Sequence, residues 1–397
     1  MAFFVHRSNR LDLLVQALAQ VVREPAQPLE PLRPETIVVQ SRALGRYLSY
    51  SLARTLGVWA CPEFPFPRRT IDLVLGAVLG DSAEAELSVF TEARMTWALA
   101  RTIPKCLEEE PEVFSPVRQY LTVETGPWPV GTRPNAEEAP RPVGARLMSL
   151  SAQLAAVFDR YLAYRPEWIL AWDRAPEEHW QSRLWHRLVR DYTSPGAPRP
   201  SHLAARAQAF FEAVGDLGAP PEGLAPRLHL FGIRTLSPLF LRIFASLGHV
   251  VELHFYHLAP SSEYFADLRP SDLLSEAGSS NPLLGSMGRL GRDLQDMLEE
   301  HDYEEAGSSF LDPAPELALL TNVERESSHP ALAVVQSDVL HLRSRRPGDA
   351  SGARPLLLRP DDRSISVHAC FGPMREVEAL RDQLLAAFEE LPGLSPR

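Results

Sequence analysis

Residues 230–260 constrain the fold more than any other part of the sequence. This segment, LFGIRTLSPLFLRIFASLGHVVELHFYHLAP, reads as a strand, a turn, a helix that Ser237 caps and Gly248 stops, and a second strand. Strand–helix–strand alternation is typical of parallel strands joined by helical crossovers. The sequence therefore predicts an α/β fold built on a parallel sheet.

Short apolar runs elsewhere extend this pattern to several strands. A polar turn or a helical pattern follows each run, as expected of buried strands. The expected strands are residues 3–6, 36–40, 228–231 and 250–256, with a later one at 364–370. A helical pattern follows the first strand, and Ser8 or Asn9 can cap its start.

The segment between the second and third strands reads mostly as helix, over residues 70–79, 91–107, 144–164, 178–192 and 202–214. We predict a helical domain of residues 81–224, inserted into an α/β domain of residues 1–80 and 225–345. A linker rich in proline, glycine and arginine is predicted over 346–363. Residues 364–397 then read as one strand and one helix, which predicts the start of another domain in a longer protein.

Residues 35–57, ETIVVQSRALGRYLSYSLARTLG, have the strand, loop and helix layout of a nucleotide-binding P-loop. A P-loop needs glycines that let the backbone approach phosphate and a lysine that reaches the β- and γ-phosphates. The loop QSRALGR has no lysine, and Lys105 is the only lysine among the 40 Lys and Arg residues. The segment LHLFGIRTLSP also ends without the acid that would hold Mg²⁺. The sequence predicts a P-loop-like domain with an inactive nucleotide site and no cofactor.

Arginines mark two segments that can meet nucleic acid. Arg42 and Arg46 lie four residues apart in the first turns of the helix that begins behind Ser41, where they can contact phosphates. The segment FDRYLAYRPEW, residues 158–168, interleaves arginines with aromatic residues, a composition that can hold single strands by phosphate pairing and base stacking. The alternative interpretation is structural in both places: solvated arginines in the first and a packed helix end in the second.

Other site chemistries find little support in the sequence. His254 and His257 are three residues apart on an expected strand, which places them on opposite faces, and His179 and His186 share a helix face without a third ligand. The 3 cysteines form no C-x-x-C pair, and no apolar run of about 18 residues predicts a membrane span. We expect no metal, no catalytic residue and a cytoplasmic location.

The net charge of −11 disfavours a surface that coats nucleic acid indiscriminately, but it permits a local basic channel.

Six motifs carry a resemblance to a known family. In chain order they are HRSNRLDLL, IVVQS, FPFP, FDRYLAYRPEW, NPLLGSMGRLGRD and CFGPMREVEALRDQLL. Together they resemble the RecC family, the gamma subunits of exodeoxyribonuclease V (the RecBCD complex). Each motif is weak alone, but six in family order are specific. The resemblance implies an N-terminal portion of a longer chain.

The resemblance implies a fold like that of superfamily 1 helicases, without ATPase activity. RecB-like and RecD-like partner subunits would carry the motors, with their ATP and Mg²⁺, and the RecB-like subunit would carry the nuclease. A RecC-like chain would bind double-stranded DNA ends, guide the separated single strands and monitor the 3′ strand for the Chi sequence. These tasks belong to double-strand break repair and homologous recombination.

Family channel residues are carried over where the motifs align. Gln40, Asp159 and Arg165 match the family pattern, whereas other positions differ from it: Arg42, Arg46, Phe66, Asp72 and Arg160. The added arginines favour phosphate contact. The candidate DNA-binding residues are therefore Gln40, Ser41, Arg42, Arg46, Phe66, Asp159, Arg160 and Arg165.

Two other functions stay open from the sequence. The first is an autonomous DNA-stimulated ATPase or nuclease, which would need Lys105 or an unrecognised site. The second is a purely architectural module that docks partner subunits and never contacts DNA.

Overall fold

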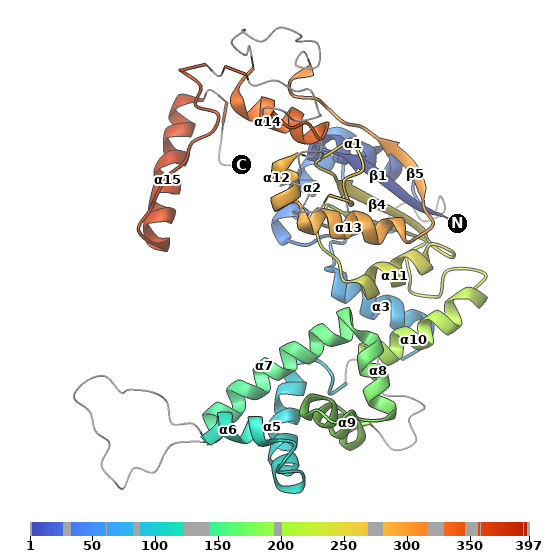
Figure 1. Ribbon diagram of the computed structural model, residues 1–397. Coiled ribbons are helices and arrows are strands. Elements are labelled where there is room, and N and C mark those ends of the chain that lie inside the picture. Colours follow the sequence, from blue (N-terminus) through green and yellow to red (C-terminus); the bar gives the residue numbers. More distant parts are fainter. Residues whose placement is uncertain are drawn as a thin grey trace. The chain divides into compact units, whose positions relative to one another are not determined.

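The computed structural model describes residues 2–26, 33–60, 62–81, 88–122, 143–193, 201–268, 281–315, 329–345, 356–357, 359–391 and 393–394 of the 397-residue chain. Five strands form one sheet in the order β2-β3-β4-β1-β5, and all neighbouring pairs are parallel. Figure 1 labels three of them, β1, β4 and β5. Their bounds are Phe3–Ser8 for β1, Thr36–Val38 for β2, Arg227–Phe231 for β3, Glu252–Leu258 for β4 and Glu304–Ser308 for β5. The predicted α/β fold with a parallel sheet is confirmed.

Four of the predicted strands are confirmed, because each is an apolar run that the sheet and its helices bury. All five residues of β3, for example, are buried. The strand predicted at 364–370 is wrong: the segment forms no strand, and its Val367 is 92% exposed. The alternation of Ile365 and Val367 suggested a strand, but this segment pairs with no described strand. The fifth strand is instead β5, whose sequence EEAGS contains no apolar run.

Helices join the strands and fill the long segment between β2 and β3. Before β3 they are α1 (Leu11–Val22), α2 (Arg42–Leu56), α3 (Pro67–Leu79), α5 (Glu92–Glu109), α6 (Ser115–Thr122), α7 (Val143–Tyr164), α8 (Pro166–Arg174), α9 (Trp180–Tyr192), α10 (Leu203–Ala213) and the short 3₁₀ helix η1 (Val214–Asp216). After β3 they are α11 (Pro238–Leu247), α12 (Pro282–Met287), α13 (Arg289–Glu299), α14 (Ala331–Leu340) and α15 (Pro373–Glu390). The helical patterns predicted between β2 and β3 are found as α3, α5, α7, α9 and α10.

Apolar side chains pack against both faces of the sheet. On one face, Leu18 of α1 and Leu48 of α2 share a buried cluster with Ile37 of β2. On the other face, Leu230 of β3 and Phe244 of α11 belong to a larger cluster that continues into α5, α7 and α9. A continuous apolar core therefore connects the sheet with the helices that follow β2.

Helix ends follow the predicted signals with one exception. The Ser237 hydroxyl accepts the Phe240 N–H and caps α11, and Gly248 ends that helix. The cap that was predicted from Ser8 or Asn9 for α1 is wrong. Arg10 occupies that position without a side-chain cap, and the Ser8 hydroxyl accepts the Arg10 N–H at 3.0 Å.

The chain divides into two compact units, Met1–Ala259 with Arg289–Phe310, and Pro260–Gly288 with Leu311–Arg397. The second unit contains α12, α14 and α15, and α15 buries none of its residues. The predicted boundaries at 81–224 and 364–397 stay a prediction, and much of the predicted linker 346–363 lies outside the described residues. No helix among the described residues is long and apolar enough to cross a membrane.

Candidate nucleic-acid interface

The junction between β2 and α2 is built by Gln40 and Ser41. The Ser41 hydroxyl accepts the Leu44 N–H at 3.1 Å and caps α2. The Gln40 side chain donates to the Thr235 carbonyl at 2.6 Å and accepts the Arg234 N–H at 3.2 Å. Gln40 therefore holds the loop that follows β3 beside the start of α2, and its amide has a structural partner.

The FPFP motif lies along β2 and carries Phe66 to the same edge of the sheet. The Ile37 N–H donates to the Glu63 carbonyl at 2.9 Å, and the Val39 N–H donates to the Pro65 carbonyl at 3.1 Å. Phe66 directly follows this segment, precedes the first residue of α3 and is 42% exposed. The structure thus brings Phe66 close to the Gln40 and Ser41 junction.

The exposed face of α2 carries arginine and tyrosine and no acid. Arg42, Arg46, Tyr50 and Arg54 recur at every fourth residue, so they form one stripe along the helix. Tyr47 borders this stripe and is 38% exposed, and Tyr50 is 58% exposed. The Arg54 guanidinium lies over the Tyr50 ring at 5.7 Å from its centroid. Sequence reasoning found Arg42 and Arg46; extending the spacing of four would have added Tyr50 and Arg54.

A second arginine and aromatic surface lies where α7 meets α8. Arg160 and Tyr164 are exposed and four residues apart, and the exposed Arg165 lies over the Trp168 ring at 5.5 Å. Tyr161 packs edge-on against Trp168, with 5.8 Å between the ring centroids. This helix end is therefore packed through one set of aromatic rings and still presents arginines to solvent.

Asp159 is engaged within the chain. Its carboxylate binds the Arg68 guanidinium of α3 at 3.1 Å, and Arg68 also lies 3.6 Å from Asp72. Burial raises the pKa of Asp72, although Arg68 and Arg206 oppose that shift. The Asp159–Arg68 pair joins α7 to the first turn of α3, directly after Phe66, and so connects the two arginine surfaces through one ion pair.

Sequence reasoning missed a stack of buried imidazoles on the sheet face under α1. His6, His229 and His254 come from β1, β3 and β4, and the His6–His254 and His229–His254 ring centroids are 5.3 and 5.4 Å apart. His254 donates to Glu252 at 2.7 Å and accepts from His6 at 3.0 Å, and His229 lies 3.2 Å from Glu35. No short sequence motif predicts this stack, because it depends on the register of three strands.

Burial disfavours the protonated form of all three imidazoles. Burial, together with the neighbouring His254 and His229, lowers the pKa of His6 to about 4. Burial also lowers the pKa of His229 to about 4 against the opposing effect of Glu35, and it lowers the pKa of His254. The described residues contain no group of three side chains that could hold a metal ion.

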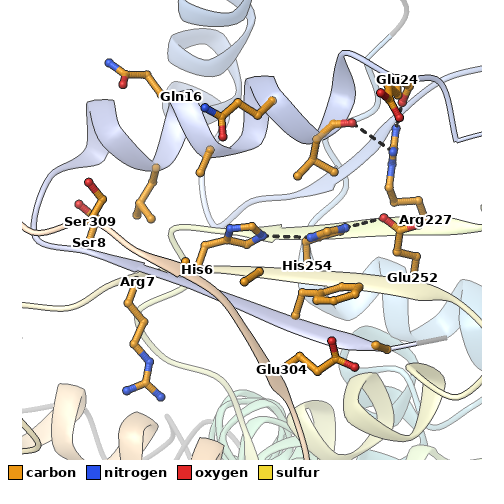
Figure 2. Close-up of a pocket in the computed structure, with 18 of the residues that line it drawn as sticks. His6, Arg7, Ser8, Gln16, Glu24, Arg227, Glu252, His254, Glu304 and Ser309 are labelled. Atoms are coloured by element: carbon orange, nitrogen blue, oxygen red, sulfur yellow. Dashed lines mark hydrogen bonds and ion pairs between the residues drawn. The ribbon is translucent and has the colours of Figure 1, made fainter.

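A groove of about 1170 Å³ lies beside this stack, between α1 and the sheet (Figure 2). His6 and His254 lie along it, and Gln16 of α1 borders it. Its acidic side chains are Glu24, Glu252 and Glu304. The groove is therefore chemically unlike the arginine surfaces.

Lys105, the residue that an autonomous enzyme would need, lies on α5. Its side chain is 54% exposed, and its ammonium group lies 3.7 Å from the Asp191 carboxylate of α9. An exposed ion pair between two helices has the geometry of a surface contact and not of a phosphate cradle.

The fold and these surfaces define an α/β protein with arginine- and tyrosine-lined surfaces on α2 and where α7 meets α8. The family described as RecC, N-terminal domain, matches residues 3–342. The chain therefore belongs to the RecC family, as its motifs predicted.

Named relatives agree with this membership. The RecBCD enzyme subunit RecC of Escherichia coli K12 is 30% identical over 441 residues, which cover 99% of this chain and 36% of that protein. The same subunit of Haemophilus influenzae is 29% identical and covers 100% of this chain and 37% of that protein. The RecBCD enzyme subunit RecC of Mycolicibacterium smegmatis is 28% identical, and the match covers 100% of this chain and 32% of that protein. The chain thus spans about a third of the length of these relatives.

Proposed function

We propose that this protein is a non-catalytic, DNA-binding and strand-guiding subunit of a RecBCD-type exodeoxyribonuclease V. It would act in double-strand break repair and homologous recombination. The observation that carries the proposal is the acid-free stripe of Arg42, Arg46, Tyr50 and Arg54 on α2. Family membership supplies the setting, because the named relatives are subunits of the RecBCD enzyme.

The stripe has the two components that single strands require. Guanidinium groups neutralise phosphates, and exposed aromatic rings accept bases by stacking. Among the described residues, Arg42, Arg46 and Arg54 have no carboxylate partner that DNA would have to displace. The surface of Arg160 and Arg165 next to Trp168 supplies a second contact of the same chemistry.

The nucleotide chemistry of a helicase motor would then belong to other subunits. The β2–α2 junction resembles a P-loop in layout, but its loop QSRALGR lacks the G-x-x-x-x-G-K-[ST] pattern and has no lysine, and the Gln40 amide is already bonded to the loop after β3. We therefore assign this chain a helicase-like domain with an inactive nucleotide site and no cofactor. ATP and Mg²⁺ would be bound by its partners.

The proposed partners are RecB-like and RecD-like subunits, double-stranded DNA ends and the single strands released from them, in the cytoplasm. The strand that passes α2 is the one we propose to be scanned for Chi. Arginine at positions 42 and 46 favours phosphate contact over base reading, so any sequence preference should be weak at these two positions.

Replacing both arginines tests the proposal. Arg42→Ala/Arg46→Ala should weaken binding of a single-stranded oligonucleotide roughly tenfold, and should flatten the slope of log K against log salt by about 1.4. Fluorescence anisotropy across a salt series, on the protein assembled with its partners, measures both quantities.

The matched control is Arg101→Ala/Arg174→Ala, which removes two exposed arginines from α5 and α8. This variant should keep the affinity and the slope of the parent protein. If the α2 variant behaves like this control while the complex still assembles, the α2 stripe does not hold the strand, and the proposal that rests on it is wrong.

A further inference from the structure

The two edge strands of the sheet, β2 and β5, differ in whether other described residues bond to their outer sides. At the β2 edge, residues 63–65 bond to the outer side of the strand through the main chain of Ile37 and Val39. At the other edge, β5 pairs with β1, and no described residue pairs with its outer side. All five residues of β5 are exposed. Among the described residues, the main-chain groups on the outer side of β5 have no pairing strand, so they can pair with another extended segment.

The surroundings of this open edge are acidic. Glu304 of β5 faces the groove under α1, which Glu24 and Glu252 also line (Figure 2). The lining arginines are already neutralised. Arg227 binds Glu35, and Arg7 pairs with acids outside the groove, Glu299 at 3.0 Å and Glu305 at 3.5 Å. Carboxylates without a cationic partner in the groove would repel a phosphate backbone, so this surface does not suit DNA.

A second copy of β5 also does not fit this edge. Parallel pairing of two β5 strands in register would bring Glu304 and Glu305 of one copy near those of the other, and like charges across strands are destabilising. Antiparallel pairing centred on Ala306 would place these acids opposite Ser308 and Gly307, which offer no positive charge. The register also skips Ala306, because Val5 pairs with Glu305 and His6 with Gly307. This bulge disfavours flat pairing of identical edges.

We infer that β5 and the acidic groove bind an extended, lysine- or arginine-bearing segment of a partner protein by strand addition. The segment's main chain pairs with the outer side of β5, and its basic side chains meet Glu304 and the groove carboxylates. This surface is separate from the arginine stripe of α2, so one chain holds DNA and a protein partner on different residues. The inference rests on the proposed function only for the choice of partners.

Hydrogen exchange on the protein co-expressed with RecB-like and RecD-like chains tests the inference. In the assembled complex, amides of β5 should exchange about tenfold more slowly than in the protein alone. If the complex forms and these amides exchange at the same rate, the inference fails and the proposed function stands. If they are already protected in the protein alone, another part of the chain or a second copy occupies the edge, and the inference is wrong.

Two variants separate charge from main-chain pairing. Glu24→Lys/Glu304→Lys should weaken assembly about tenfold at low salt, through lost charge complementarity in the groove. Ala306→Pro should remove strand addition while keeping the β1 pairing, because Ala306 has no β1 partner.

The control Glu212→Lys/Glu222→Lys changes two exposed acids elsewhere and should assemble normally. All variants should bind single-stranded DNA as the parent does; assembly at parental strength by both Glu24→Lys/Glu304→Lys and Ala306→Pro would overturn the inference.

Discussion

At the scale of residues, ion pairing separates the arginines that hold the fold from those that can hold a ligand. Arg206 is 3% exposed and donates two hydrogen bonds of 3.0 and 2.8 Å to Asp81. Binding a ligand with this guanidinium would therefore break a buried ion pair of the fold. Arg42, Arg46 and Arg54 are exposed, and no described carboxylate pairs with them. A guanidinium without a carboxylate partner gains most from a phosphate, since no existing ion pair has to break.

Tyr50 provides the sharpest test at this scale, because stacking and hydroxyl bonding can be separated there. Tyr50→Ala should weaken single-strand binding by about 1–3 kcal/mol, whereas Tyr50→Phe should keep nearly all of it, because the ring supplies the stacking surface. Anisotropy titrations with a thymidine oligonucleotide measure both. Tyr120→Ala removes a 44% exposed ring from α6 as a control and should have no effect. Equal losses in Tyr50→Ala and Tyr50→Phe would contradict stacking.

At the scale of elements, one glycine fixes the FPFP segment against α2. A Cβ atom added at Gly45 would lie 3.1 Å from Cγ of Phe64. The ring can approach this closely only because Gly45 has no side chain. That approach holds the main chain of residues 63–65 along β2 and so positions Phe66 beside the start of α2. A helix glycine that looks unfavourable in isolation is thus explained by packing.

Gly45→Val should destabilise the protein by about 1–3 kcal/mol, because the added methyl groups overlap Phe64 and outweigh the small gain in helix propensity. Urea unfolding followed by circular dichroism measures the difference in the free energy of unfolding. Gly218→Val is the control, since a Cβ atom there meets nothing within 4 Å. A Gly45→Val protein as stable as this control would show that the segment yields without cost.

Elements were predictable from the sequence where burial leaves a local pattern. β3 and β4 are apolar runs, and α5, α7 and α9 have clear helical periodicity, so residues alone predict them. β5 was missed because all of its residues are exposed and only its pairing with β1 makes it a strand.

At the interface, the spacing of four residues was enough to predict Arg42 and Arg46. The partners of Gln40 and Asp159 are 195 and 91 residues away along the chain, so no local pattern could reveal them.

At the scale of the whole molecule, the imidazole stack makes the sheet's stability depend on pH. His6, His229 and His254 bridge three adjacent strands with neutral rings. The residues facing them are Glu35, Glu252, Tyr256 and Arg227, and the carboxylates only partly offset the effect of burial. Because Arg227 already binds Glu35, protonating the stack would place new positive charge beside an existing guanidinium.

The sign of the pH dependence follows from the lowered pKa values. His6 and His229 have pKa values of about 4 in the folded protein, below the ordinary value of 6.5 that they regain on unfolding. The unfolded state therefore binds protons first, so stability is complete above pH 6.5 and is lost as the pH falls from there towards 4.

We expect the free energy of unfolding in urea to fall by roughly 1 kcal/mol per histidine for each pH unit in that window. His6→Phe should reduce this dependence, because phenylalanine keeps the stacking on Tyr256, where the centroids are 4.5 Å apart, and takes up no proton. His249→Gln, at an exposed position, should leave the dependence unchanged. If the free energy of unfolding depends on pH in the same way in His6→Phe and His249→Gln, the acid sensitivity comes from other groups. The imidazole stack would then contribute to packing only.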